Sequence, residues 1–199
     1  MHHFKALALA ALVLVGGCRQ EAAPAPDYRP GEAGTVDHAL CLLGFTAVPV
    51  REISTGHHLV QAAINGRRGE FVLDTGANMT VIDTAHLANF GLSPNSGSIG
   101  GAVSIGGGGQ ARRLSIDSFT VGGTPVRQDR VVTSDLGQLL TTLSRVAGIE
   151  VNGIVGQDVL KEHRAIIDVA RPMLYLIEAD EDPAPVPAEQ CVGARGAGS

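Results

Sequence analysis

Residues 71–83 read FVLDTGANMTVID, and this stretch decides the fold of the chain. Asp74 follows Phe71-Val72-Leu73, at the end of a strand predicted for 69–73, and a second strand is predicted for 79–82 directly after the turn. Gly76 lets the backbone turn sharply and lets another chain approach closely. A carboxylate in apolar surroundings resists ionisation, and two adjacent carboxylates share one proton, so one acts as base and the other as acid. Such a pair activates water without a metal or a cofactor, and Asp74 is therefore the candidate catalytic residue.

Two other acids repeat part of this pattern. Asp83 is followed by Thr84 but not by a glycine, and it precedes a predicted helix over 84–89, so we expect it to cap that helix. Asp168 also follows an apolar run, but it lacks the Thr and Gly and has Arg171 close by as a partner. We interpret Asp168 as structural; if it were catalytic, a single chain would hold both carboxylates.

The rest of the body, 45–176, has mostly the patterns of β-strands. Asn65-Gly66 predicts a tight hairpin between the strand 59–64 and the strand before Asp74. A second, longer hairpin is predicted from 98–105 and 111–121, followed by a strand over 126–133. Helices are predicted for 136–146, capped by Ser134 or Asp135 and ended by Gly148, and for 157–164, and short strands for 165–168 and 173–177.

Asp74-Thr75-Gly76-Ala77 resembles the active-site turn of the retropepsin-like aspartic proteases, in particular their single-domain bacterial members. Ile154-Val155-Gly156, ahead of a predicted helix, is similar to the motif of two apolar residues and a glycine that braces the active-site loop in that family. The tip of the long hairpin lies where the family has its flap, and it consists of Gly106, Gly107, Gly108 and Gly109. The resemblance covers about residues 45–177.

The resemblance implies a mostly β fold: a closed acid-protease barrel with a flap hairpin and two or three short helices. It implies an aspartic endopeptidase that works as a homodimer on protein or peptide substrates, because each chain supplies one catalytic Asp74. Thr75 and Gly76 would hold the two carboxylates coplanar, and the flap would close over the cleft between the subunits. The leucine-spaced helix before Ile154 departs from the family pattern, and its role at the interface or the cleft is open.

A second function on the same fold is a non-catalytic, lipid-anchored module that binds an extended peptide along the flap strands. The intact Asp-Thr-Gly argues against it, because a scaffold has no need of a costly carboxylate there. Other chemistries find no support. The formal net charge of −5 argues against a nucleic-acid partner, and the spacing of His57, His58, His86 and His163 is not that of metal ligands.

Residues 1–17 have the shape of a signal peptide, and Val15-Gly16-Gly17-Cys18 resembles a bacterial lipobox, with Cys18 as the lipidated residue. The alternative is an ordinary signal peptide that contains a cysteine. Residues 18–40 then form a tether from the lipid anchor to the protease domain, 41–178, and Arg19 favours the outer membrane, on the periplasmic side of the envelope. The segment 179–199 is rich in Pro, Ala, Gly and acids and is expected to be disordered.

Two cysteines remain, Cys41 and Cys191. In an oxidising compartment they either form a disulfide, which would tie the C-terminal tail to the start of the domain, or stay as two free thiols.

Overall fold

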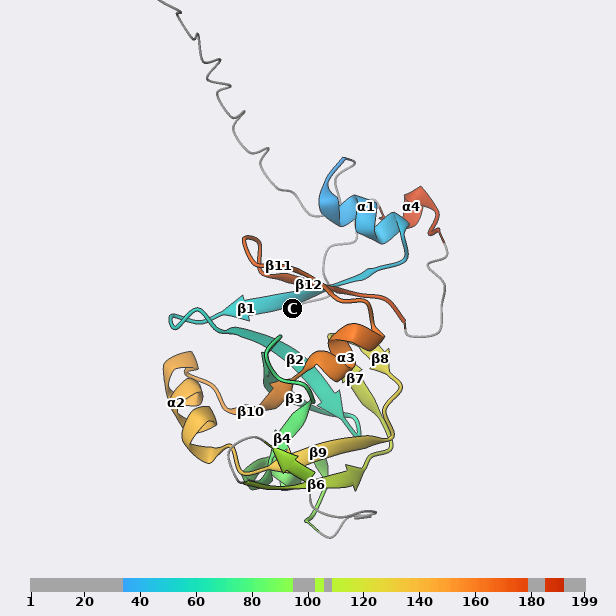
Figure 1. Ribbon diagram of the computed structural model, residues 1–199. Coiled ribbons are helices and arrows are strands. Elements are labelled where there is room, and N and C mark those ends of the chain that lie inside the picture. Colours follow the sequence, from blue (N-terminus) through green and yellow to red (C-terminus); the bar gives the residue numbers. More distant parts are fainter. Residues whose placement is uncertain (1–33, 95–102, 106–108, 179–184, 192–199) are drawn as a thin grey trace, which may run out of the picture.

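The computed structural model of the chain describes residues 34–94, 103–105, 109–178 and 185–191 (Figure 1). Strands dominate these residues, which confirms the mostly β fold class. The strands are β1 Thr46–Glu52, β2 His58–Ile64, β3 Arg67–Leu73, β4 Val81–Asp83, β5 Val103–Ile105, β6 Gly109–Ser115, β7 Phe119–Val121, β8 Thr124–Val126, β9 Arg130–Ser134, β10 Val151–Val155, β11 Ile166–Asp168 and β12 Met173–Leu176. The helices are α1 Val36–Leu42, the 3₁₀ helix η1 Thr84–Phe90, α2 Gly137–Ala147, α3 Gln157–Glu162 and α4 Ala188–Cys191.

The strands join into one hydrogen-bonded sheet with a side branch. Its order is β11-β12-β1-β2-β3-β10-β4-β9-β6-β5, and β7 branches from β2 and pairs with β8. Because β11 and β5 stand at opposite ends of this path, the described sheet is strongly bent but not closed into a ring, and the expected closed barrel is corrected in that respect. The helices η1, α2 and α3 lie where the sequence predicts them, while β1, α1 and α4 were not predicted.

The hairpin of β2 and β3 delivers the chain to Asp74. Its turn residues Asn65 and Gly66 have φ of 51° and 73°, which is the left-handed backbone that a two-residue hairpin turn requires. The Asn65 side chain also serves a neighbouring segment, because its Oδ1 accepts the backbone N–H of Asp117 at 2.8 Å. This bond explains one difference from the sequence prediction: the run 111–121 is divided at this point into β6, which pairs with β9, and β7, which pairs with β2.

The run 126–133 is divided as well. Its start belongs to β8, which folds back on β7 through the turn at Gly122-Gly123, and its end belongs to β9, which joins β4 and β6. Helix α2 has no side-chain cap at its start, contrary to the expectation for Ser134 or Asp135. The Asp135 carboxylate instead accepts the N–H of Gly137 at 2.9 Å, two residues along the chain.

Strand β10 lies between β3 and β4, although it follows them by some seventy residues. It runs parallel to β3 and antiparallel to β4, and all five of its residues are buried. Gly153 makes this close packing possible, because a Cβ there would stand 2.3 Å from the Val81 carbonyl oxygen. The two strands that flank the Asp74 turn are thus held apart and in register by a third.

Helix α2 packs against the outside of these strands. Leu140 and Leu143 are buried in one cluster with Val72 of β3 and Ile154 of β10. Burying each leucine contributes about 1.5–3 kcal/mol to the stability of the fold. Leu139, on the other face of the helix, is 49 % exposed. The helix therefore supports β3 and β10 with only part of its predicted apolar face.

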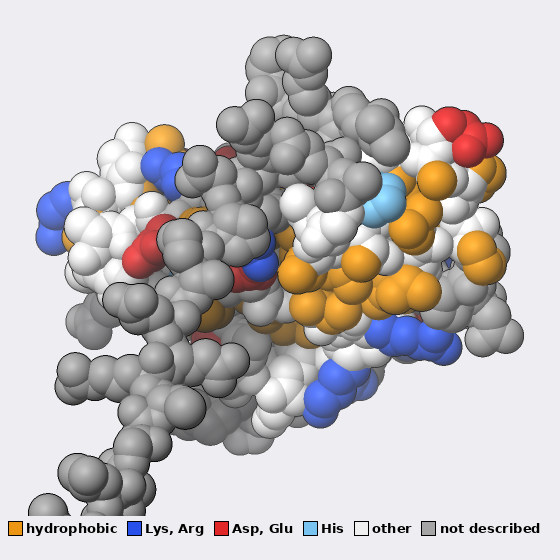
Figure 2. All heavy atoms as spheres, turned by 90° about the horizontal axis from the view of Figure 1, so that it is seen from above, with side chains coloured by type: hydrophobic (Ala, Val, Ile, Leu, Met, Phe, Trp, Pro, Cys, Tyr) orange, Lys and Arg blue, Asp and Glu red, His pale blue; other side chains and the backbone are white. Residues whose placement is uncertain are grey.

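A disulfide between Cys41 and Cys191 joins α1 to α4, which lie together at one end of the molecule (Figure 1). The backbone N–H of Val186 adds a hydrogen bond of 3.0 Å to the Leu42 carbonyl. Residues 185–191, which the sequence assigned to a disordered tail, are thus attached to the start of the domain. Figure 2 looks onto this end and shows hydrophobic side chains gathered there. The large exposed hydrophobic residues of α1 and its C-cap and of the β11 hairpin are Val36, Leu43, Ile166 and Val169.

Candidate active site

Asp74 is the first residue after β3, and its backbone is fixed by the neighbouring strand. Its N–H donates to the Val155 carbonyl at 3.0 Å, which continues the parallel pairing of β3 with β10 by one residue. Its carboxylate oxygen Oδ1 accepts the Gly76 N–H at 2.7 Å. A Cβ on Gly76 would stand 3.1 Å from that same oxygen, which is a tight contact, so glycine fits this position best. The carboxylate is half-buried, and Thr75 beside it is exposed.

Ile154, Val155 and Gly156 lie directly against this turn, as the sequence predicts for a bracing motif. Ile154 and Val155 pair with the last two residues of β3. Gly156 is fully covered, and a Cβ on it would come within 2.6 Å of the Met79 backbone and 2.9 Å of the Ala77 carbonyl oxygen. Because both neighbours are backbone atoms, a larger residue at 156 would displace the turn that carries Asp74.

Sequence reasoning missed the pair of residues that connects these segments. Thr80 is buried, and the Asp158 carboxylate accepts both its N–H, at 2.9 Å to each oxygen, and its hydroxyl, at 2.8 Å. The Thr80 hydroxyl in turn accepts the Gly156 N–H at 3.1 Å, and Asp158 accepts the Val159 N–H at 2.9 Å. An Asp in the first turn of a helix is ordinary in a sequence, because it interacts favourably with the helix dipole, so only the spatial pairing reveals this hub.

Gln157 holds the turn itself at two points. Its backbone N–H donates to the Ala77 carbonyl at 2.8 Å, and its side-chain amide nitrogen lies 2.5 Å from the Thr75 carbonyl oxygen. These carbonyls belong to Thr75 and Ala77, the residues before and after Gly76 in the chain. Gln157 was not a sequence candidate either, because a glutamine at the start of a helix carries no motif of its own.

The other two acids have structural partners. Asp83 caps η1 by accepting the Ala85 N–H, as predicted. Asp168 forms an ion pair with Arg171, with 2.7 Å and 2.8 Å between its Oδ2 and two guanidinium nitrogens. Burial alone would raise the pKa of Asp168, but the hydrogen bonds from the Arg171 backbone and side chain, that residue's charge and the Ala170 N–H together lower it. Strand β11 is not a neighbour of β3 in the sheet, and in the described residues no hydrogen bond or ion pair joins Asp168 to Asp74, so the structure gives no support for a carboxylate pair within one chain.

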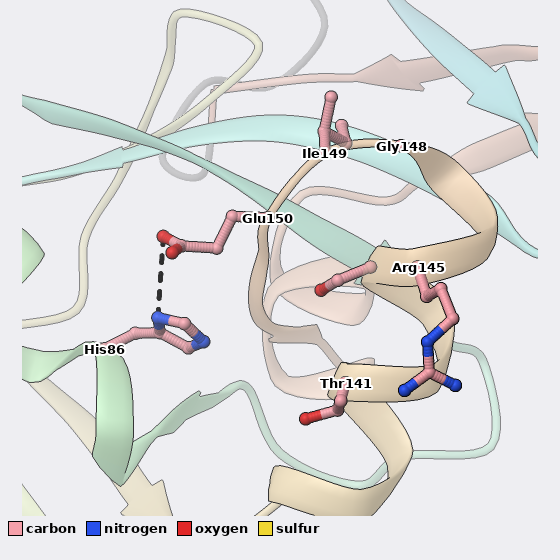
Figure 3. A pocket seen from close by; sticks show the side chains of 7 residues that line it. His86, Thr141, Arg145, Gly148, Ile149 and Glu150 are labelled. Atoms are coloured by element: carbon pink, nitrogen blue, oxygen red, sulfur yellow. Dashed lines mark ion pairs between the residues drawn. The ribbon is translucent and has the colours of Figure 1, made fainter.

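A second polar cluster lies at the opposite end of β10, about 13 Å along the strand. His86 Nδ1 is 3.5 Å from the Glu150 carboxylate, which also accepts the side-chain amides of Asn89 and Asn152 at 2.7 Å. Figure 3 shows this pair beside α2, at a pocket of about 500 Å³. The cluster ties η1 to the start of β10 and is separate from the Asp74 turn.

Several predicted site residues fall outside the described part of the chain. They are Cys18 and the flap glycines Gly106, Gly107 and Gly108. Gly109 is the first residue of β6, which pairs with β5, so the stem of the predicted flap hairpin is present.

Metal ligands and membrane spans were sought in the described residues alone. There, no three His, Cys, Asp or Glu side chains are close enough together to hold a metal ion. His163 is fully buried, with Nδ1 2.7 Å from the Ile177 carbonyl oxygen. Over the same residues, none of the helices combines the length and apolar character that crossing a bilayer requires.

Solved structures similar to this one include a retropepsin-like aspartic protease from Rickettsia conorii, with 15% identity, a TM-score of 0.46, and coverage of 67% of this chain and 98% of that chain. The EIAV protease complexed with the inhibitor HBY-793 has 20% identity and a TM-score of 0.40, and the likeness covers 55% of this chain and 90% of that one. No curated protein matches the chain. A family model described as aspartyl protease matches residues 60–159, which is half of the chain and includes the Asp74 turn, the flap stem and the bracing motif. The chain therefore belongs to the aspartyl protease family, as its resemblance to the retropepsin-like members predicts.

Proposed function

We propose that the protein is an aspartic endopeptidase that acts as a homodimer, with Asp74 of each copy supplying one carboxylate. The observation that carries this proposal is the state of the Asp74 side chain. It is half-buried at the end of a strand, one of its oxygens is held by the Gly76 N–H, and in the described residues no hydrogen bond reaches the other oxygen. A carboxylate fixed in this way has an oxygen available for water or for a second carboxylate.

Two such carboxylates side by side share one proton, because like charges that close do not both ionise. The ionised one removes a proton from a water molecule, whose oxygen bonds to the peptide carbonyl carbon. The protonated one donates its proton to the developing oxyanion and becomes ionised. The C–N bond then breaks as the first carboxyl gives the proton it took from water to the amine nitrogen, and the second carboxylate takes back a hydroxyl proton, which restores the single shared proton. No covalent intermediate is required.

The need for two copies follows from the count of available turns. The described chain has one Asp-Thr-Gly turn, and the two other acids that repeat part of its pattern have structural partners: Asp83 caps η1 and Asp168 is paired with Arg171. A working assembly must therefore bring the Asp74 turns of two copies face to face.

The experiment is a cleavage assay on an unstructured polypeptide across mildly acidic pH, with the wild type, Asp74→Asn and Asp168→Asn. We expect pepstatin-type inhibition, loss of cleavage in Asp74→Asn, and retained cleavage in the matched change at Asp168. Light scattering with and without the inhibitor measures the mass of the assembly. Cleavage by Asp74→Asn at the wild-type rate would refute the proposal, and peptide binding without cleavage, unchanged in Asp74→Ala, would indicate a non-catalytic module instead.

We also propose that the protein is anchored by a lipid on Cys18 at the periplasmic side of a bacterial envelope, with the outer membrane favoured. The lipobox-like residues before Cys18 support this location, and so does the Cys41–Cys191 disulfide, since disulfides persist mainly in oxidising compartments. Metabolic labelling with a fatty acid tests it: label on the wild type and none on Cys18→Ala is expected. Equal labelling of both, or of neither, would contradict the anchor.

A further inference from the structure

We infer that Gln157 is a positioning residue for the catalytic carboxylate, and that it acts through a single peptide plane. This inference rests on the proposed function, since it assigns a part of that same site. Its geometric basis is a chain of two hydrogen bonds that meet at the peptide between Thr75 and Gly76.

The carbonyl of Thr75 and the N–H of Gly76 belong to one peptide unit. Because the unit is planar and trans, as are all peptide bonds in the described chain, these two groups point in opposite directions. The Gln157 side-chain amide donates to the carbonyl end, at 2.5 Å. The N–H end donates to Asp74 Oδ1, at 2.7 Å. A rotation of the plane would break both bonds together, so the bond to Gln157 fixes the direction of the N–H that orients the carboxylate.

The plane needs such a restraint because core packing does not supply one. Thr75 and Gly76 are both exposed, and glycine gives the backbone unusual freedom to rotate. Within the residues that the structure describes, the Thr75 carbonyl accepts no hydrogen bond other than the one that Gln157 donates. The carbonyl of Ala77, two residues along the chain, is held by the Gln157 backbone N–H.

Gln157 can perform this role because its own position is rigid. It is the first residue of α3, whose second residue, Asp158, is anchored to buried Thr80, and whose Val159 and Leu160 are buried in the core. The side chain therefore reaches the turn from a fixed helix. A hydrogen bond at an exposed site adds little net stability, but a misplacement of a catalytic group by about 1 Å can reduce the rate about 100-fold. Loss of the bond should then appear in kcat rather than in stability.

The test compares Gln157→Leu, Gln157→Glu and the control Gln138→Glu, which makes the same change at an exposed glutamine on α2. We expect Gln157→Leu to lower kcat by about 10- to 100-fold, with KM and the unfolding midpoint nearly unchanged. Gln157→Glu should behave like Gln157→Leu where the new carboxyl is ionised. Below its ordinary pKa of about 4.3, the protonated carboxyl donates to the Thr75 carbonyl, and kcat relative to wild type should recover. A merely structural role would leave that ratio independent of pH.

A second measurement does not depend on cleavage. The solvent-exchange rate of the Gly76 amide, followed by NMR, should rise severalfold in Gln157→Leu and stay unchanged in Gln138→Glu. A kcat of Gln157→Leu within twofold of wild type, or an unchanged Gly76 exchange rate, would overturn the inference while leaving the protease activity in place. If the wild type cleaves nothing, the proposed function fails by itself, and the exchange rate still decides whether Gln157 orients the plane.

Discussion

The hydrogen-bond hub of Thr80 and Asp158 permits a prediction of coupled stability. Thr80→Val keeps the shape of the side chain but removes the hydroxyl that accepts the Gly156 N–H and donates to Asp158. Asp158→Ala removes the acceptor for both donors of Thr80 and for the Val159 N–H. Thr80→Ser is the matched control, because it keeps the hydroxyl and loses only a methyl group.

The magnitudes follow from the burial of these groups. Thr80→Val leaves the buried Gly156 N–H without its acceptor, which costs about 2 kcal/mol of unfolding free energy. Asp158→Ala leaves two donors of buried Thr80 without a partner, and because Asp158 is only half-buried, water compensates in part, so we expect a loss of about 3 kcal/mol. Thr80→Ser should cost about 1 kcal/mol. The double variant should lose about 4 kcal/mol, less than the sum, because the bond between the two residues is lost only once.

The assay is denaturant unfolding followed by circular dichroism, since the chain has no tryptophan. Protein concentration is held constant because association would shift the apparent stability. Additivity of the single changes within about 0.5 kcal/mol, or a Thr80→Ser loss as large as that of Thr80→Val, would refute the view that the hydroxyl connects the bracing motif to α3.

Three further predictions concern the rest of the fold. Because the folded-state pKa of Asp168 is lowered, its pairing with Arg171 stabilises the fold above the ordinary pKa of about 3.9, and this stabilisation is lost as pH falls through the lowered pKa. Asp168→Asn should therefore cost about 1 kcal/mol of unfolding free energy at pH 7 and almost nothing near pH 2. Unfolding experiments at both pH values measure this difference. Gly122→Ala should destabilise the fold by about 3 kcal/mol and Gly123→Ala by about 1 kcal/mol. Both glycines have positive φ, but only a Cβ at 122 would stand 2.1 Å from a buried valine, Val48. Equal losses in thermal unfolding would contradict this. Reducing the disulfide should lower the unfolding free energy by about 3–5 kcal/mol, since it closes a span of 150 residues, and an unchanged unfolding midpoint under reducing conditions would count against it.

Local patterns were enough to place the Asp74 turn and the elements next to it. The hairpin at Asn65-Gly66 was predicted because Asn-Gly is a favoured pair for a two-residue turn, in which both residues have left-handed backbone. Asp83 was predicted as a helix cap because, unlike Asp74, it is not followed by Thr and Gly. The division of 111–121 could not be foreseen, because it depends on a side chain of Asn65 that lies 52 residues away from Asp117 in sequence.

The site was predicted only as far as its motif. Asp74, Gly76 and Gly156 carry recognisable signals, since each is required at its place by chemistry or by the lack of room for a Cβ. Thr80 and Gln157 carry none, because their roles arise from contacts between segments about 80 residues apart. The closed barrel was expected from family resemblance and not from any residue pattern, and the described sheet is instead an open path from β11 to β5 with a branch that ends at β8.

The placement of β10 between β3 and β4 also sets the time at which the site is completed during synthesis. The segment 75–80 leaves the ribosome 76 to 82 residues ahead of its hydrogen-bond partners at 156–158. At a usual elongation rate of about 5–20 residues per second, this is a delay of about 4–16 seconds. During that interval the nascent chain carries Asp74 in an unbraced loop. Nearly the whole domain must be made before the turn can take its final shape, so a truncated chain that ends before β10 contains the motif but not the site.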